Sequence, residues 1–170
     1  GPRSTWSLAV LFLGLLGWVW YVELPLPSPT AQLPVFLDTP VERIGRVELA
    51  TAGGAINATR IASEWLDPRG NPWPDGSVVD LLATLATLRP LRTIAPEPAD
   101  IGRYGVGQRR LRVLRHDGSV ALDLELGNLN PAQTALYART TGQPEIVLVG
   151  AVLQWDLAKL EKAASRVLKP

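Results

Sequence analysis

Arg110-Leu-Arg-Val-Leu-Arg-His-Asp-Gly-Ser-Val-Ala-Leu-Asp-Leu-Glu-Leu126 is the stretch of sequence that decides the fold. Apolar and polar residues alternate on both sides of His116-Asp-Gly-Ser119, as they do in half-buried strands. The Asp-Gly pair supplies the positive φ angles that a tight hairpin turn needs. We therefore predict two antiparallel strands, at 110–115 and 120–126, joined by this turn.

Further strands and two helices are expected on either side of the hairpin. The helix at 78–88 carries a leucine stripe at helical spacing and follows Asp75-Gly-Ser77, a predicted cap. The helix at 155–168 is amphipathic, so it packs on a sheet or on a partner. The other predicted strands are 45–51, 55–63, 91–94, 134–140 and 145–149. Mostly antiparallel strands with two packed helices predict a small α+β domain.

The segment from Trp6 to Val22 is predicted to cross a membrane once as a helix. It carries no charge and no proline, and seventeen residues at about 1.5 Å each reach about 26 Å, enough for a bilayer core. Trp and Tyr side chains at both ends are typical of the aromatic belts of a spanning helix. A cleaved signal peptide is the alternative, but the best cleavage site, Ser28–Ala31, is a poor small-residue signal.

Charges on either side of this segment predict its orientation. Arg3 precedes it, whereas Glu23 follows it and the next basic residue is Arg43. The positive-inside bias then places the N-terminus in the cytoplasm and the domain in the periplasm. Abundant Arg, Ala, Gly and Pro indicate a bacterial chain, hence an inner membrane. The predicted organisation is a cytoplasmic N-terminus (1–5), a span (6–22), a Pro-rich linker (23–39) and an extracytoplasmic domain (40–170).

Several residues in and after the span are candidates for contact with a partner. Gly14 and Gly17 would let another helix approach closely, although membrane helices also tolerate glycine in general. Alternating prolines within Leu24–Pro34 favour an extended spacer, either a plain linker or a segment that runs along a partner. Trp73, between two prolines, is expected to be exposed. The candidate contacts are Trp6, Gly14, Gly17, Trp18, Trp20, Tyr21, Pro25, Pro27, Pro29 and Trp73.

Composition argues against several classes of function. Lys and Arg total 17 and Asp and Glu 16, so no strong field favours nucleic acid. The chain has no Cys, which excludes disulfides, thiolate metal sites and a Cys nucleophile. Its single histidine, His116, falls in a predicted exposed turn and is not expected to act as a ligand or base. No cofactor, metal or enzymatic activity is expected.

Asp123 and Glu125 are the most plausible chemical pair, because residues two apart on a strand face the same way. They could serve as acid and base or hold a cation. Cross-strand pairing with Arg110, Arg112 or Arg115 is the simpler interpretation.

The soluble part, over roughly 40–150, resembles a bacterial envelope family of unknown function whose members have one N-terminal span and repeated α+β units. The motifs that carry the resemblance are the Trp and Pro-rich loop (Trp65 to Pro74), the Leu-rich helix from Asp80, Tyr104-Gly-Val106, Asp117-Gly118, Leu126-Gly127 and the Tyr137 strand. Several such relatives accompany ABC-type exporters of gliding-type systems. The resemblance implies that association and supplies no catalytic residues.

We therefore expect a non-catalytic accessory subunit of a larger integral-membrane complex, in contact with other membrane subunits and the bilayer. An ABC-type exporter is the host that the resemblance implies, and a photosynthetic reaction-centre and light-harvesting assembly is the other host considered. The alternative is a periplasmic ligand-binding or sensor module tethered to the inner membrane, with a pocket between sheet and helix near Trp65 and Tyr104.

Overall fold

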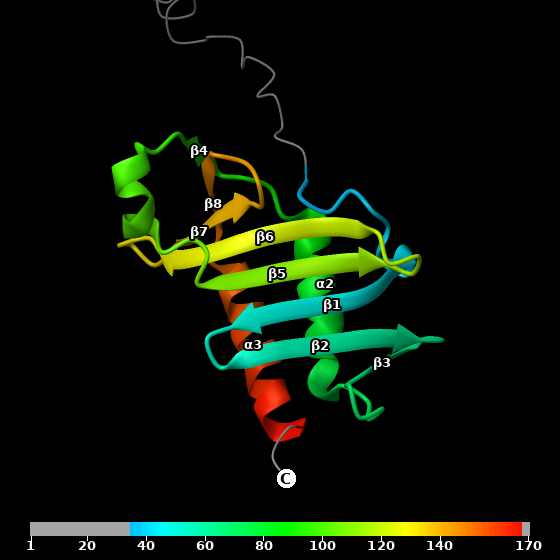
Figure 1. The fold of residues 1–170 in the computed structure, drawn as a ribbon. Helices are drawn as coiled ribbons and strands as arrows, with labels where there is room; N and C mark the ends of the chain where they lie inside the picture. The colour runs from blue at the N-terminus through cyan, green and yellow to red at the C-terminus, as the bar shows by residue number, and fades with distance from the viewer. Residues whose placement is uncertain (1–34, 168–170) are drawn as a thin grey trace, which may run out of the picture. The chain divides into compact units, whose positions relative to one another are not determined.

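An eight-stranded antiparallel sheet with two α-helices on one face makes up the domain (Figure 1). The structure is a computed structural model that describes residues 35–167. The strand order is β3-β2-β1-β5-β6-β7-β8-β4. The strands are β1 (Ile44–Thr51), β2 (Gly54–Ile61), β3 (Glu64–Leu66), β4 (Arg92–Ile94), β5 (Arg109–Arg115), β6 (Val120–Leu129), β7 (Ala135–Thr140) and β8 (Ile146–Gly150). The α+β class is thus confirmed.

The predicted hairpin lies at the centre of this sheet. β5 and β6 pair in antiparallel fashion, with Leu111 opposite Leu124 and Arg112 opposite Asp123. Gly118 in the connecting turn has φ +82°, a conformation that glycine adopts without strain. Because side chains alternate along each strand, the leucines face the helices and the charged side chains lie on the opposite, open face of the sheet.

The two α-helices, α2 (Ser77–Thr87) and α3 (Val152–Val167), run antiparallel to each other. Thr84 Oγ1 lies 2.5 Å from an Asp156 carboxylate oxygen, and Arg166 Nη1 lies 2.7 Å from Asp75 at the other end of the pair. The N-cap residue of α2 is Gly76, inside the predicted stretch 75–77, but no side chain makes a capping hydrogen bond there. The hydroxyl of the buried Ser77 donates to the Pro74 carbonyl because this serine already lies inside the helix.

One hydrophobic core fills the space between the sheet and the helices. Its fully buried large side chains include Leu49, Leu111, Leu124, Leu126 and Leu136 from the strands and Leu81, Leu82, Leu85, Leu153 and Leu157 from the helices. At about 1.5 to 3 kcal/mol for each buried side chain of this size, the core is the main source of stability.

The domain begins earlier than residue 40, where the sequence places its start. Leu37 is 2% exposed in the core, and the Phe36 N–H donates to the Leu88 carbonyl after α2 at 3.1 Å. Of the residues assigned to the linker, Leu37 and Thr39 are therefore buried in the domain and Phe36 is half-buried, whereas Asp38 is exposed. The predicted span at 6–22 lies outside the described residues. Within residues 35–167, no helix has the length and apolarity that crossing a bilayer requires.

Two short elements do not follow from the sequence pattern. β3 forms an edge strand on β2, and the loop after it is held by the buried Asp67, whose Oδ1 accepts from the N–H groups of Arg69 and Asn71. The stretch 95–107, which has no helical or strand periodicity, contains the 3₁₀ helix η3 (Pro98–Tyr104). Two further 3₁₀ turns, η1 (Val41–Arg43) and η2 (Pro74–Gly76), precede β1 and α2.

Candidate functional site

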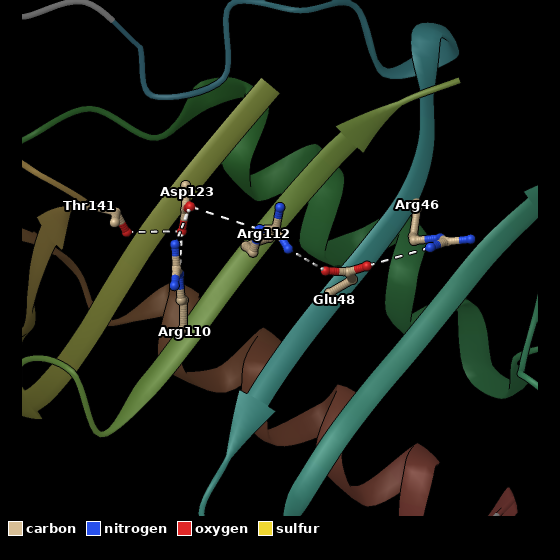
Figure 2. Close-up of polar contacts among 6 residues, drawn as sticks. All are labelled: Arg46, Glu48, Arg110, Arg112, Asp123 and Thr141. Carbon is tan, nitrogen blue, oxygen red and sulfur yellow. Dashed lines mark hydrogen bonds and ion pairs between the residues drawn. The ribbon is translucent and has the colours of Figure 1, made fainter. Parts of the chain in front are cut away.

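Charged side chains cover the open face of the sheet at its centre (Figure 2). They come from β1, β5 and β6 because residues two apart on a strand point the same way. We call this group the charged ladder; its members are Arg46, Glu48, Arg110, Arg112 and Asp123, and Thr141, which follows β7, adds a hydrogen bond to Asp123. Alternate residues on the same strands, such as Val47 and Leu124, are buried under the helices.

Asp123 has the largest set of partners in the charged ladder. Its two oxygens accept from Arg110 Nε and Nη2 at 2.8 and 2.7 Å, which is a bidentate pair. Thr141 Oγ1 donates to it at 2.9 Å, and Arg112 Nε lies 3.8 Å away. Arg112 also reaches Glu48 at 3.1 Å, and Glu48 lies 3.6 Å from Arg46, so the ion pairs run continuously across three strands.

Glu125 belongs to a separate pair on the same face. Its Oε2 accepts from Arg139 of β7 at 2.9 Å through Nε and at 2.5 Å through Nη2. The two carboxylates of β6 are therefore fastened to arginines on opposite neighbouring strands. The expected cross-strand pairing is confirmed for Asp123 with Arg110, whereas the partner of Glu125 is one that the sequence reasoning missed.

This arrangement keeps Asp123 ionised. The hydrogen bonds from Arg110 lower the pKa of Asp123 below its ordinary value, against a partial desolvation that raises it, and Thr141 and Arg112 lower it further. Asp123 in turn raises the pKa of Arg110. A carboxylate with a depressed pKa is a poor proton donor at neutral pH. The ladder is thus suited to holding the strands in register and to presenting fixed charge.

Trp73 differs from expectation, because it is half-buried and packs against the core. Its indole Nε1 is buried without a hydrogen-bond partner. Trp73 and Trp65 line one cleft of about 200 Å³ beside the start of α2. The other sequence-based contact candidates, from Trp6 to Pro29, lie outside the described residues.

Tyr104 lines a different cleft, so the expected single pocket near Trp65 and Tyr104 is not formed. This second cleft, about 390 Å³, also contains Tyr137, whose ring meets that of Tyr104 edge-on with centroids 4.8 Å apart. The two clefts belong to opposite parts of the sheet: Trp65 lies on the edge strand β3, whereas Tyr137 lies on β7.

Trp155 is the exposed aromatic residue that sequence reasoning missed. Its side chain is 69% exposed, and Val152, one turn earlier in α3, is also exposed. The apolar stripe of this helix contains Leu153, Leu157 and Leu160. A position two residues after Leu153 falls off that stripe at 100° per residue, which is the signal that could have identified Trp155 as exposed.

Within residues 35–167 there is no group of three or more His, Asp or Glu side chains placed to hold a metal ion. The lone histidine, His116, is exposed in the β5–β6 turn, as expected, with Nε2 3.3 Å from the Glu42 carbonyl oxygen.

Comparison with known proteins gives one match. The model of a family described as a domain of unknown function, DUF4340, matches residues 66–164, which run from the end of β3 into α3. Neither the curated proteins nor the solved structures provide a match. The matched range contains the Tyr104 and Tyr137 cleft, α2 and most of α3, but not β1 and β2.

Proposed function

Because the chain belongs to the DUF4340 family, a family without an assigned activity, we propose its function from the domain's own surface. We propose that it is a non-catalytic accessory subunit of a larger integral-membrane complex. In this proposal the predicted span at 6–22 anchors the subunit, and the domain docks on the extracytoplasmic face of a partner. The family match supports the resemblance to a family of unknown function; the exporter association remains part of the proposal.

The observation that carries the proposal is an apolar surface at one end of the domain. Three exposed side chains, Leu91, Val152 and Trp155, form what we call the apolar end. Val152 and Trp155 are one turn apart at the start of α3. The Leu91 N–H donates to the Leu148 carbonyl in β8 at 2.7 Å, and β8 leads directly into α3.

The described chain enters the domain at this same end. Phe36 bonds to Leu88 at the C-terminal end of α2, and α2 lies antiparallel to α3, so this contact and the start of α3 share one end of the helix layer. Figure 1 shows the chain entering beside α2 at the end where β4 and β8 lie.

An exposed Trp with neighbouring aliphatic side chains is what a protein interface uses as an anchor. A partner embedded in the same membrane would meet the apolar end at high effective concentration, because the span confines both proteins. Docking at this position would also remove the exposed apolar area from water. These three points favour a membrane-embedded partner over a freely diffusing one.

Site-specific photocrosslinking of the full chain in its native membrane tests the proposal. The variant Trp155→p-benzoylphenylalanine carries a photoreactive side chain at position 155. On illumination, it should crosslink to an integral-membrane subunit. The matched control is Val79→p-benzoylphenylalanine, because Val79 is 54% exposed but lies in the first turn of α2, at the other end of the helix layer. Equal capture from both positions, or capture of lipid alone at 155, would contradict the proposal. Mass spectrometry of the captured chain distinguishes an exporter from a photosynthetic assembly.

A further inference from the structure

An open cleft of about 390 Å³ lies where η3 meets β6 and β7, and we call it the tyrosine cleft. Tyr137 reaches it from the open face of the sheet, because its neighbours Leu136 and Ala138 are buried on the helix face. Tyr104 reaches it from the end of η3. The full lining is Arg103, Tyr104, Asn128, Leu129, Pro131 and Tyr137.

A β-bulge in β6 shapes the tyrosine cleft. The register of β6 against β7 shifts between Leu126 and Leu129. Gly127 and Asn128 consequently lie opposite a single residue, Tyr137. Such a bulge bends its strand and re-aims side chains, and bulges are common beside binding sites. Here it brings the Asn128 side chain against the end of η3 and into the lining of the cleft.

Two glycines hold the walls of the cleft together. A Cβ on Gly127 would lie 2.3 Å from the Tyr104 carbonyl oxygen, so η3 packs directly on the backbone of β6 at the open face. Gly105, which follows η3, has φ +64°, and a Cβ on it would lie 2.6 Å from Nδ2 of Asn128. The positions of Tyr104 and Asn128 are thus set by close backbone contacts, and the cleft is formed before any ligand binds.

Three neutral polar groups of the cleft are free to bind a ligand. They are the hydroxyls of Tyr104 and Tyr137 and the amide of Asn128, and none of them makes a hydrogen bond to any residue in the range 35–167. Both tyrosines are half-buried and Asn128 is exposed. Neither hydroxyl is among the buried atoms of the described chain that lack a partner, so both are open to solvent.

The charge of the cleft argues against an anionic ligand. Among the six lining residues, Arg103 alone is charged, and its Nη1 lies 3.3 Å from Asp100 within η3. The Arg103 side chain is also 78% exposed, so its field is screened by water. A purely apolar ligand would instead cover three polar groups without giving them partners, which is costly. The lining therefore favours a neutral ligand with several polar groups.

We propose that the tyrosine cleft binds a sugar ring of a neutral carbohydrate. Tyrosine hydroxyls and an asparagine amide both donate and accept hydrogen bonds, as sugar hydroxyls do. The electron-rich face of an aromatic ring attracts the C–H groups on the face of a sugar. The cleft volume falls within the range of about 300 to 1,000 Å³ that is typical of small-molecule sites.

A Pro-rich peptide is the other ligand that binds aromatic grooves. Proline residues offer carbonyl acceptors but no N–H donor. Such a peptide would use the donors of the cleft and leave its acceptors without partners, whereas a sugar satisfies both. The mixed donor and acceptor set therefore favours the carbohydrate.

Saturation-transfer difference NMR on the full chain in phosphatidylcholine nanodiscs tests the proposal. The probes are cellobiose, maltose and diacetylchitobiose, which are neutral disaccharides. We expect at least one of them to bind saturably, with the strongest transfer to its ring C–H protons. Sorbitol, which has hydroxyls but no ring face, should give no transfer. Nanodiscs without the protein provide the blank.

Two substitutions locate the binding. Tyr137→Phe keeps the ring and should weaken binding about fivefold, the effect of one neutral hydrogen bond. Asn128→Ala should weaken it at least about fivefold for the same reason, and because Asn128 is exposed this variant keeps the fold. The matched control is Gln143→Ala, which removes an exposed amide in the turn between β7 and β8, outside the cleft, and should leave binding unchanged.

The proposal is overturned if none of the three disaccharides binds, if sorbitol binds as tightly as the best of them, or if Gln143→Ala weakens binding as much as Asn128→Ala. A decaproline peptide is the last probe. If it binds while the disaccharides do not, the cleft recognises a polyproline helix and not a sugar. Crosslinking at position 155 reports on docking alone, so failure of one proposal leaves the other testable.

Discussion

Gly127 of β6 is the point at which η3 lies closest to the sheet. A Cβ at this position would lie 2.3 Å from the backbone carbonyl oxygen of Tyr104 and 3.0 Å from the N of Val106. Both obstacles are backbone atoms, which cannot rotate away as a side chain can. The Tyr104-Gly-Val and Leu-Gly127 motifs, far apart in sequence, are thus two halves of one contact.

The first prediction follows from this contact. Gly127→Ala should lower the free energy of unfolding by about 2 kcal/mol or more, because η3 or β6 must shift. Gly102→Ala in η3 is the control, since an added Cβ there meets nothing within 4 Å and needs no positive φ. Urea unfolding of both variants gives the comparison. A similar, small effect of the two substitutions would show that η3 is loosely docked.

Asp123 gives a prediction about pH. Its folded-state pKa is depressed, so its ion pairs stabilise the fold above the unfolded pKa of about 3.9 and are lost as pH falls through the folded value. Asp123→Asn should cost about 1 to 3 kcal/mol at pH 7, the range for hydrogen bonds to charged groups. The difference between wild type and variant should shrink below about pH 4. Unfolding curves from pH 7 to 2.5 test this, and a difference that stays constant over that range would contradict the assigned role.

At the scale of secondary-structure elements, α3 has one face buried in the core and one face exposed to solvent. Leu157 is fully buried in the core, whereas Trp155, two residues earlier, is 69% exposed. Leu157→Ala should cost about 2 to 5 kcal/mol because it leaves a cavity. Trp155→Ser should change the free energy of unfolding by less than about 0.5 kcal/mol.

Chemical denaturation of both variants measures these effects. The proposed role of Trp155 then requires a separate result: Trp155→Ser should weaken partner association while stability is retained. If Trp155→Ser unfolds the domain instead, this residue is structural and the apolar end is not a free docking surface.

Elements with a strong local pattern could be predicted from the sequence. The Asp-Gly turn defines β5 and β6, and leucine periodicity identifies α2 and α3 to within a few residues. β3 could not be predicted, because three residues beside a Pro-rich loop have no periodicity and are ordered by pairing with β2. The Glu125 and Arg139 pair depends on the register of β6 with β7, which is a non-local property.

The clefts are the feature that the sequence predicts least well, because they also depend on which distant segments become neighbours. Tyr104 and Tyr137 are 33 positions apart in the sequence, so the cleft that they line exists only once η3 lies beside β7. Trp65 and Tyr104 line separate clefts because Trp65 lies on β3, whereas Tyr104 packs on Tyr137 of β7, and the strand order places β3 and β7 far apart. Residue type alone could suggest these side chains as candidates, but not which of them share a site.

At the scale of the whole molecule, the prediction concerns the division between anchor and domain. Residues 34–170 form one unit separate from 1–33, and the described core begins at Leu37 and draws on both helices and the strands. A variant that lacks residues 1–33 should therefore fold, with a cooperative thermal transition, because no core residue is removed. In the proposed role it should also be released from the membrane and lose its partner, since the span no longer confines it there.

Copurification from membranes, with the full chain and the shortened variant tagged at the same C-terminal position, measures the second effect. Addition of an unrelated single-span anchor to the shortened variant is the informative control. If bilayer confinement and the apolar end are sufficient, this chimera should recover the partner, and Trp155→Ser within the chimera should lose it again. If only the native segment restores association, contacts of the span, such as those predicted for Gly14 and Gly17, must determine partner choice, and docking through Trp155 would be secondary.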